Sequence, residues 1–585
     1  MATSSILAVS TCTVSSLVVS PVAGDLLHRK PHFDHHPNVW GDYFLTFSPC
    51  TPSMLLNMKS KVHIMEEQVR RMILERSSGS SLHVKLELVD TLERLCIDYH
   101  YVKEIDDVLR WIHEEVEDDA DNHYDLHTTA LRFYLLRKHG YHVSPDVFLR
   151  FRDEEGNFTC DDSNGTRSML SLYNAAHVRI HGEEMLDDAM VFTENYLQSA
   201  MKHLQSPMAD EVRCALRTPL FRRPRRVEAR RYISVYQKLP TRNETILEFA
   251  KLDVGILQAL YCEELKTLTM WWKQLQLRDH LSFARERIVE MHFWMLGVLF
   301  EPQYSFGRIM LTKLFIFVSI FDDIYDNYST LEESKLFTEA MERWDEEAAE
   351  ELPGYMKFFY KKVLTTIKAI ERDLKLQGNK HVDYVKNLLI HATQCYYNEV
   401  KWRTEGGEAA NVEEHLKISV PSSSCMHVPV YAFISMGNDV TTDDAINWGM
   451  AYPKIITSSC IIGRLLNDIA SHEREQESSE HVVSSTVEAC MREHGGISKE
   501  EAYVKLRELV EESWMDIAEE CLRPPAAQPA PLLEAVVNAT RMLDFLYKDQ
   551  DAYTLPHALK DTIHSIYVDS PSRKREHGST LLESI

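Results

Sequence analysis

Three aspartates at the end of an apolar stretch are the residues of this chain best suited to chemistry. Asp322, Asp323 and Asp326 directly follow the apolar run 311–321. In a helix, Asp322 and Asp326 lie one turn apart on the same face. Carboxylates at a buried helix end resist ionisation unless a cation lies between them. A hard divalent cation, above all Mg2+, suits such oxygen ligands and keeps positions open for phosphate. A solvated acidic helix end is the alternative that so short a motif allows.

A second set of oxygen-bearing side chains follows later in the chain. Asn467, Ser471 and Glu475 stand at positions i, i+4 and i+8, which form one face of a helix. An amide, a hydroxyl and a carboxylate make a low-charge oxygen set that suits a hard cation carrying water and phosphate. Asp468 and Glu473 fall on other faces, so we expect them to be solvated or to support the ligands. An ordinary polar helix face is the alternative, but two such faces in one chain favour a metal site.

Arginines accompany both acidic faces. Arg285 and Arg287 precede the aspartates, and Arg464 precedes Asn467. Guanidinium groups bind phosphate oxygens in a bidentate way and stay charged in any pocket. A metal ion and arginines together neutralise the charge that develops on a departing diphosphate. Surface salt bridging is the alternative for Arg285 and Arg287. The combination predicts a diphosphate substrate that is ionised.

These motifs resemble those of plant class I terpene synthases. The DDxxD motif, the (N/D)Dxx(S/T)xxxE motif and the RxR motif stand in that family's order and spacing. Other segments are similar to its scaffold signatures: Lys30-Pro31 followed after eight residues by Trp40, and the segments 92–100, 131–141, 300–304 and 547–554. The similar segments reach from about residue 29 to residue 570, nearly the whole chain.

The resemblance implies an all-α fold of two helical domains. We expect residues 1–28 to be a disordered leader. Residues 29–240 are then an N-terminal relic α-barrel domain, and residues 241–585 a C-terminal class I terpenoid synthase α-bundle that binds metal. Prolines in and around the basic run 220–231 place the boundary near 235–245, before a helix that begins at Glu244.

The resemblance also implies roles for individual residues. The metal ligands are expected to be Asp322, Asp323, Asp326, Asn467, Ser471 and Glu475. The substrate-binding residues are expected to be Arg285, Arg287, Asp322, Asp326, Arg464 and Asn467. Arg285, Arg287, Trp294, Asp551 and Tyr553 are expected to be catalytic, with Trp294 and other aromatic faces stabilising a carbocation. Three Mg2+ ions are the expected cofactors, and Mn2+ is an expected substitute.

The function that the resemblance implies is a Mg2+-dependent sesquiterpene synthase, a carbon–oxygen lyase acting on farnesyl diphosphate. Lys30-Pro31 replaces the tandem arginines associated with monoterpene formation, which favours the sesquiterpene product. A monoterpene synthase on geranyl diphosphate, a chain-elongating prenyl transferase and a non-catalytic helical relative stay open. No DxDD sequence occurs, which argues against cyclisation started by protonation. The family's flexible helix break reads Pro421–Cys425 here.

Composition agrees with a large soluble protein. A chain of 585 residues and 67.8 kDa exceeds one hydrophobic core and should divide into domains. The net charge of −25, without a basic stripe, argues against nucleic acid as a partner. Eleven scattered cysteines without a CxxC pair suit a reducing compartment. No apolar run reaches the ~18 residues that a membrane span needs, and we expect a monomer.

The N-terminus and the helical periodicity complete the sequence-based expectations. Residues 1–28 are rich in Ser and Thr but contain no Lys or Arg, so a cytosolic location is favoured and a plastid transit peptide is the alternative. Apolar periodicity predicts helices over 54–75, 84–116 and 128–139. A proline-rich segment, 523–531, predicts a loop between two late helices.

Overall fold

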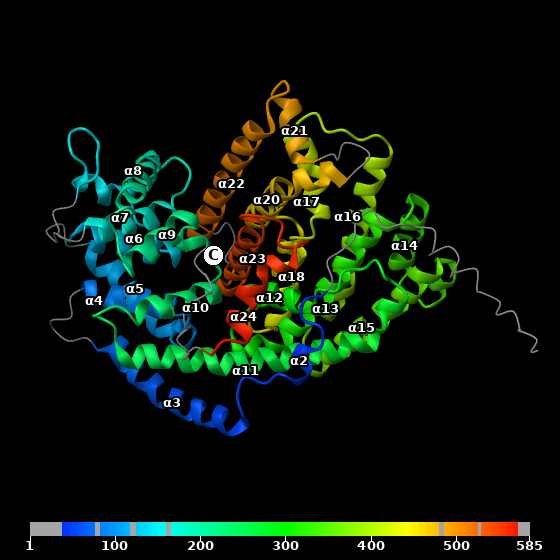
Figure 1. Cartoon of the computed structure of the whole chain (residues 1–585), viewed down its shortest axis with the longest axis horizontal. Coiled ribbons are helices and arrows are strands. Elements are labelled where there is room, and N and C mark those ends of the chain that lie inside the picture. Colours follow the sequence, from blue (N-terminus) through cyan, green and yellow to red (C-terminus); the bar gives the residue numbers. More distant parts are fainter. Residues whose placement is uncertain are drawn as a thin grey trace, which may run out of the picture.

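The computed structural model describes residues 38–75, 82–117, 124–159, 165–478, 485–523 and 528–570 (Figure 1). Its α-helices are α2 (Tyr43–Thr46), α3 (Pro52–Leu74), α4 (Leu82–Arg94), α5 (Val102–Glu117), α6 (Leu126–Lys138), α7 (Gly165–Ala176), α8 (Glu184–Ala200), α9 (Met208–Arg217), α10 (Arg225–Tyr236), α11 (Glu244–Leu275), α12 (Ile288–Val298), α13 (Ser305–Asp322), α14 (Leu331–Arg343), α15 (Gly354–Leu376), α16 (Val382–Thr404), α17 (Val412–Ser422), α18 (His427–Met436), α19 (Asp443–Met450), α20 (Lys454–Ser478), α21 (Thr486–Glu493), α22 (Lys499–Leu522), α23 (Ala530–Tyr547) and α24 (Lys560–Tyr567). Short 3-10 turns are Asp98–His100, Pro145–Phe151, Leu220–Arg222, Leu277–Asp279, Pro302–Tyr304, Glu347–Glu351 and Pro556–Leu559, and a π-helical turn spans Asp323–Tyr328.

The all-α architecture predicted from the sequence is confirmed. The described ranges form no strand, and their only β feature is an isolated antiparallel bridge between Arg152 and Phe158. Figure 1 shows helices α4–α10 gathered on one side and α12–α18 on the other, with α11 running below both groups. Helix α11 packs against α3 and α10 on one side and against α12 and α13 on the other. It therefore connects the two groups of helices.

The predicted helices are confirmed at two places and corrected at a third. Helix α3 matches the prediction for 54–75, and α6 matches that for 128–139. The predicted helix 84–116 is wrong as a single element, because it divides into α4 and α5. Cys96 has a positive φ of 55°, a conformation that ends a right-handed helix. Periodicity continues across the break because both helices bury apolar side chains in the same core.

Local capping explains where α11 begins. The side chain of Asn243 accepts hydrogen bonds from the backbone N–H groups of Thr245 and Ile246, an arrangement that satisfies donors at a helix start. The helix thus begins at Glu244, as predicted, and α10 ends at Tyr236.

The domain boundary predicted at 240/241 falls in the connection between α10 and α11 and stays a prediction. The predicted loop 523–531 is confirmed in part by the ends of α22 and α23, since residues 524–527 lie outside the described ranges.

Helix α13 runs through the core of the second group. Nearly all of its side chains from Met310 to Phe321 are buried, and it packs against α11, α12, α16 and α18. Within the described residues, the segment Pro302–Tyr328 is the one helical stretch long and apolar enough to cross a membrane, and 72% of its most apolar window is buried inside the protein. Such burial is typical of a core helix in a large protein. The sequence analysis missed this stretch because it counted only uninterrupted apolar runs.

The N-terminal helices surround an internal space. Helices α4, α6, α7, α9 and α10, with the start of α11, line a cavity of about 790 Å3. Its wall mixes apolar side chains with charged ones, among them Glu87, Asp90 and Arg94. A ring of helices around a hollow interior agrees with the α-barrel expected for this half of the chain.

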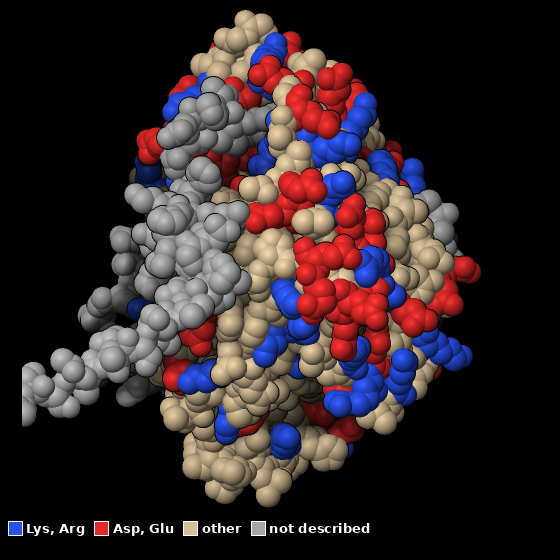
Figure 2. Space-filling model, turned by 90° about the vertical axis from the view of Figure 1, so that its right-hand side faces the viewer, with Lys and Arg blue, Asp and Glu red and all other residues tan. Residues whose placement is uncertain are grey.

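The surface of the second group carries much of the negative charge. Figure 2 shows acidic side chains interspersed with fewer basic ones over the side of the molecule where α14 and α15 lie in Figure 1. Helix α14 and the 3-10 turn after it contribute several exposed acids, including Glu332, Glu339 and Glu347. This face agrees with the net charge of −25.

Candidate active site

A second cavity lies between helices of the C-terminal group. It has a volume of about 550 Å3, and its wall comes from α12, α13, α16, α20, α23 and the connection between α17 and α18. Nine of the residues singled out from the sequence line it: Arg285, Trp294, Asp322, Asp326, Arg464, Asn467, Glu475, Asp551 and Tyr553. The remaining three, Arg287, Asp323 and Ser471, are not part of its described wall.

The aspartate cluster stands where α13 ends. Helix α13 ends at Asp322, and the chain continues as the π-helical turn Asp323–Tyr328. π-helical turns are rare and occur frequently at functional sites. Asp322 and Asp326 both line the cavity, as the i, i+4 spacing predicted. Asp323 is fully buried, and its carboxylate accepts a hydrogen bond of 2.9 Å from the backbone N–H of Arg285.

Arg285 compensates part of this negative charge. Its guanidinium forms ion pairs with Asp322 and with Asp323, the latter at 2.7 Å between Nε and Oδ1. The predicted metal-ligand role of Asp323 is therefore not the role that this geometry favours, because the carboxylate holds the Arg285 segment in place. A role as positioning residue fits its burial and its two contacts with Arg285.

The arginines beside the carboxylates that face the cavity do not offset the effect of burial on their pKa values. Burial raises the pKa of Asp322 to about 7, although the Arg285 guanidinium lowers it. Burial also raises the pKa of Asp326, against the ion pair of 2.6 Å with Arg403. The pKa of Glu475 is raised by burial and by the nearby Asp468. Ionised carboxylates are thus disfavoured here unless a cation enters.

Helix α20 presents the second acidic face. Asn467 and Glu475 line the cavity, while Ser471 is fully buried between them along the same face. Asp468 also lines the cavity, and its carboxylate accepts a hydrogen bond of 2.8 Å from the backbone N–H of Thr486. This contact agrees with the expected supporting role of Asp468. Glu473 is exposed and pairs with Lys499 on α22, so it takes no part in the face.

Arg464 and Arg287 lie in different settings. Arg464 lines the cavity and pairs with Glu399 at 3.2 Å and with Asp468 at 3.6 Å. Arg287 precedes α12 and is 3% exposed. Among the described residues, its Nε and Nη2 donors meet no hydrogen-bond partner. Burial lowers the pKa of Arg287, and a buried guanidinium with unused donors is suited to an anionic ligand.

Aromatic rings form the wall beside Arg285. The rings of Trp294 and Tyr553 stack at 5.1 Å between centroids, and the Arg285 guanidinium lies 4.4 Å from the Tyr553 ring centroid. The Tyr553 hydroxyl donates a hydrogen bond of 3.0 Å to Ser319 on α13. Aliphatic side chains of α12, α13 and α23 continue this wall. An apolar, aromatic surface thus meets the carboxylates and arginines in one cavity.

Asp551 lines the cavity from the segment that follows α23. Its carboxylate pairs with Arg474 of α20 at 2.6 Å and accepts a hydrogen bond from the backbone N–H of Thr554. These contacts tie the segment after α23 to the helix that carries Asn467 and Glu475. The geometry gives Asp551 a positioning contact, so its predicted catalytic role stays a prediction.

Several cavity residues were missed by the sequence analysis. Tyr396, Glu399 and Arg403 line the cavity from α16 and stand at i, i+3 and i+7, which is one helix face. The spacing was visible in the sequence, but no acidic or metal-binding pattern drew attention to it. Arg474 and Tyr547 also line the cavity. The aromatic rings of Phe321, Tyr325 and Tyr431 are buried outside its described wall.

The helix break predicted at Pro421–Cys425 is present. Helix α17 ends at Ser422, Ser424 has a positive φ of 56°, and α18 begins at His427. Ser422, Ser424 and Cys425 line the cavity. The break therefore brings consecutive residues, Ser422 to Cys425, to the cavity wall, whereas a continuous helix would turn some of them away from it.

The donor set fits a hard divalent cation. Asp322 and Asp326 from one side and Asn467 and Glu475 from the other provide carboxylate and amide oxygens in one cavity. Such oxygens are the ligands that Mg2+ takes, and added positive charge offsets the raised pKa values of these carboxyl groups. No cysteine or histidine belongs to this set, which disfavours softer metals.

Comparison with known families agrees with this fold and site. A model of the terpene synthase N-terminal domain matches residues 39–216, and a model of the terpene synthase family metal binding domain matches residues 273–516. The second match contains the aspartate cluster and the face on α20. The chain belongs to the terpene synthase family, whose members of this type are lyases.

Similar proteins are plant terpene synthases. The chain is 51% identical to (E)-beta-caryophyllene synthase of Zea mays, over 92% of this chain and 96% of the maize protein. It is 45% identical to beta-sesquiphellandrene synthase of Sorghum bicolor, over 91% of this chain and 95% of that protein. It resembles the crystal structure of isoprene synthase from grey poplar (Populus x canescens) in complex with three Mg2+ ions and dimethylallyl-S-thiolodiphosphate. The TM-score is 0.81 at 32% identity, covering 92% of this chain and 100% of the poplar chain.

Proposed function

We propose that this protein is a Mg2+-dependent sesquiterpene synthase that ionises farnesyl diphosphate and converts the allylic cation into a C15 product. One observation carries the proposal. Two oxygen-bearing faces and four arginines meet an aromatic and aliphatic wall within a single cavity of about 550 Å3. The oxygen-bearing faces and the arginines suit a metal-bound diphosphate, and the aromatic and aliphatic wall suits an isoprenoid chain and its carbocation.

The relatives support the choice of substrate and cofactor. The maize and sorghum proteins are named for sesquiterpene products, and both match nearly the whole of this chain. The poplar structure holds three Mg2+ ions and a prenyl diphosphate analogue on a similar fold. We extend the ion number to this protein, and we propose that Mn2+ can replace Mg2+ because it accepts the same oxygen ligands.

The residues would share the work as follows. Asp322, Asp326, Asn467 and Glu475 would hold Mg2+, which when bound neutralises charge on the leaving diphosphate. Arg464 and the unused donors of Arg287 would bind diphosphate oxygens. Of the other two predicted ligands, Asp323 pairs with Arg285, and Ser471 is buried on the same helix face as Asn467 and Glu475.

Arg285 would have different partners in the metal-free and the metal-bound protein. Its ion pairs with the aspartates occupy the guanidinium while no cation is present. A divalent cation bound at Asp322 would compete for that carboxylate and free one side of the guanidinium for diphosphate. Arg285 thus fits the substrate-binding role predicted for it, in the metal-loaded state.

The aromatic wall would protect the cation. Ring faces stabilise a cation by roughly 0.5–2 kcal/mol each without reacting with it. Trp294 and Tyr553, which stack in the cavity wall, would serve this role, and Tyr396 would add a further ring from α16. Closure of the cavity around the substrate would exclude water, which would otherwise quench the cation.

Product analysis tests the proposal. The purified protein is incubated with geranyl, farnesyl or geranylgeranyl diphosphate, with and without Mg2+, and products are identified by gas chromatography–mass spectrometry. Mg2+-dependent C15 product from farnesyl diphosphate supports the proposal. C10 product alone would establish a monoterpene synthase instead, and elongated diphosphates after addition of isopentenyl diphosphate would establish a prenyl transferase. No product from any substrate would contradict an active enzyme.

The expected cytosolic location and monomeric state remain predictions.

A further inference from the structure

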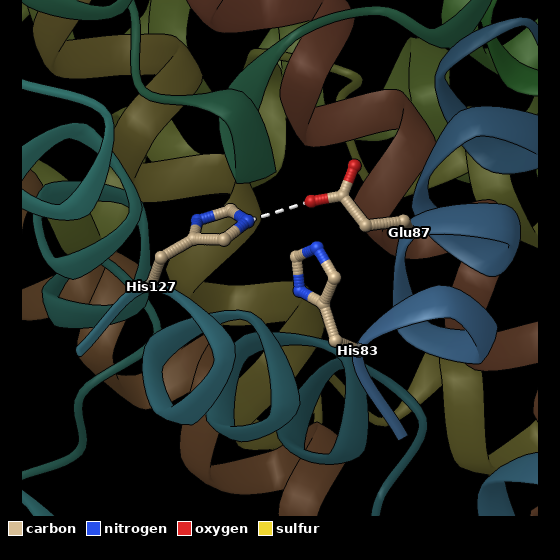
Figure 3. Close-up of side chains that lie close together, drawn as sticks. All are labelled: His83, Glu87 and His127. Atoms are coloured by element: carbon tan, nitrogen blue, oxygen red, sulfur yellow. Dashed lines mark hydrogen bonds and ion pairs between the residues drawn. The ribbon is translucent and has the colours of Figure 1, made fainter. Parts of the chain in front are cut away.

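A group of metal-binding side chains lies in the N-terminal helices, far from the aspartates in the sequence. His83 and Glu87 stand one turn apart on α4, and His127 faces them from α6 (Figure 3). One potential ligand atom from each side chain lies within 4.8 Å of the others. Two imidazoles and one carboxylate form a known ligand set for Zn2+, with metal–ligand distances of about 2.0–2.2 Å.

Hydroxyl groups hold the outer nitrogens of both histidines. Nδ1 of His127 lies 2.6 Å from the Ser171 hydroxyl, and Nδ1 of His83 lies 3.2 Å from the Thr128 hydroxyl. In each case Nε2 is the nitrogen left on the side of Glu87, and Nε2 of His127 contacts Glu87 at 2.6 Å. Metal-binding histidines characteristically donate their other N–H to such a partner, which fixes the tautomer and the ring orientation.

The group opens into the large N-terminal cavity. His83, Glu87 and His127 all line the space of about 790 Å3, and so does Asp90, one helical turn beyond Glu87. An ion held by the three side chains would therefore keep coordination positions for water or for a ligand within the cavity. This access distinguishes the group from a packed polar cluster in a closed core.

Arg167 is the competing cation. Its guanidinium forms an ion pair with Glu87, and its side chain is 40% exposed. An exposed arginine can turn toward solvent at low cost, because exposed ion pairs contribute only ~0–1 kcal/mol. The Glu87 carboxylate is then available to another cation.

A second histidine–carboxylate group is less suited to bind a metal ion. His181, Asp516 and Glu519 lie close together on the surface. Lys454 pairs with both carboxylates at 2.8 Å, so its ammonium already supplies the positive charge. His181 Nε2 contacts the Asp516 carboxylate directly at 2.8 Å, and the Ser458 hydroxyl donates a hydrogen bond of 3.0 Å to the same carboxylate.

We propose that His83, Glu87 and His127 form a binding site for a divalent transition ion of the Zn2+ type in the wall of the N-terminal cavity. The site is separate from the oxygen-only set at the aspartates, and its histidines select a softer metal than Mg2+. It does not depend on the proposed terpene synthase activity.

Zn2+ binding to the full-length protein tests the site. Equilibrium dialysis with elemental analysis is done in millimolar Mg2+, so that the oxygen sites are occupied by the harder ion. The expected result is a Zn2+ ion retained by the wild type and lost in His83→Ala and in His127→Ala. The matched control is His142→Ala, because His142 is an exposed histidine outside the group. Equal Zn2+ content in the wild type and in both histidine variants would overturn the proposal, as would a wild type that retains none.

Two further variants separate metal binding from folding. Ser171→Ala should weaken Zn2+ affinity by about 10–100-fold, since it removes the partner that orients His127. Arg167→Ala should tighten Zn2+ binding, because it removes the competing cation. A purely structural ion pair predicts the opposite for Arg167→Ala, with lower stability and unchanged Zn2+ binding. Co2+ absorption in the visible range gives an independent readout, since coordination by histidine alters the spectrum. The melting temperature measured without Zn2+ shows whether each variant is folded.

Discussion

Asp322 and Asp323 are neighbours in the sequence but have different tasks. Asp322 lines the cavity, whereas Asp323 is fully buried against Arg285. Replacing Asp322 with Asn should lower turnover by at least about 100-fold, because an amide binds a hard cation more weakly than a carboxylate. Steady-state kinetics with farnesyl diphosphate measures the loss. Glu473→Gln on α20 is the matched control and should keep wild-type rates, since Glu473 pairs with Lys499 outside the cavity.

Asp323→Asn should act through stability instead. The change leaves the buried Arg285 guanidinium with less compensation, and breaking a buried ion pair typically costs about 3–5 kcal/mol. We expect a loss of roughly 2–4 kcal/mol in the free energy of unfolding, because Arg285 keeps its pair with Asp322. Urea unfolding measures it. An unchanged stability combined with a large loss of Mg2+ affinity would instead make Asp323 a metal ligand.

The raised pKa of Asp322 makes the metal-free protein sensitive to pH. The folded-state pKa of about 7 lies above the value of about 3.9 for an unfolded aspartate. The protonated Asp322 carboxyl therefore contributes to the free energy of unfolding. This contribution is fully present below pH 4 and is lost as the pH rises through 7. Asp322→Asn should gain on the order of 2 kcal/mol relative to wild type between pH 5 and pH 8. Thermal unfolding without metal tests this, and Mg2+ should reduce the difference. A constant difference across that pH range would contradict the assigned shift.

At the scale of elements, close packing between α12 and α23 shapes the cavity. Gly297 on α12 lies against Met542 on α23, and a Cβ at position 297 would collide with the Met542 side chain. Met542 lines the cavity, so Gly297→Ala should push its flexible thioether chain into the space for substrate. We expect a changed product mixture with a stability loss of about 1–3 kcal/mol. Gas chromatography of the products measures the change in the product mixture. An unchanged product profile would show that Met542 does not move into the substrate space.

The elements also show what a sequence can predict here. The spacing of Asn467 and Glu475 placed them on one face of a helix, because helical periodicity is a local property. The π-helical turn after Asp322 and the break at Cys96 were not predicted, because the periodicity of apolar residues does not reveal either of them. The residues of α16 that line the cavity were missed for the same reason: only the fold shows which face of a helix meets the substrate space. The burial of Asp323 against Arg285 likewise could not be read from the spacing of the aspartates.

At the scale of the whole molecule, buried arginines connect the N-terminal helices to the C-terminal ones. Arg222 is 4% exposed and forms a bidentate ion pair with Glu511 on α22. Arg541 on α23 donates a hydrogen bond of 2.7 Å to the backbone carbonyl of Phe221. Such contacts cross between the two groups, and α11 packs against both. The N-terminal helices thus support the elements that carry the active site.

This connection predicts that the two groups of helices unfold together. Glu511→Ala leaves the buried Arg222 guanidinium without its carboxylate, at an expected cost of roughly 2–4 kcal/mol, since Glu511 is itself partly exposed. Differential scanning calorimetry should show one transition for the wild type and one transition at lower temperature for the variant. Glu512→Ala, next in the chain, is the control and should leave the melting temperature nearly unchanged, because no ion pair to the N-terminal helices involves it among the described residues. Two separate transitions in the wild type would show instead that the groups are independent, and the activity of the C-terminal group would then survive removal of the N-terminal one.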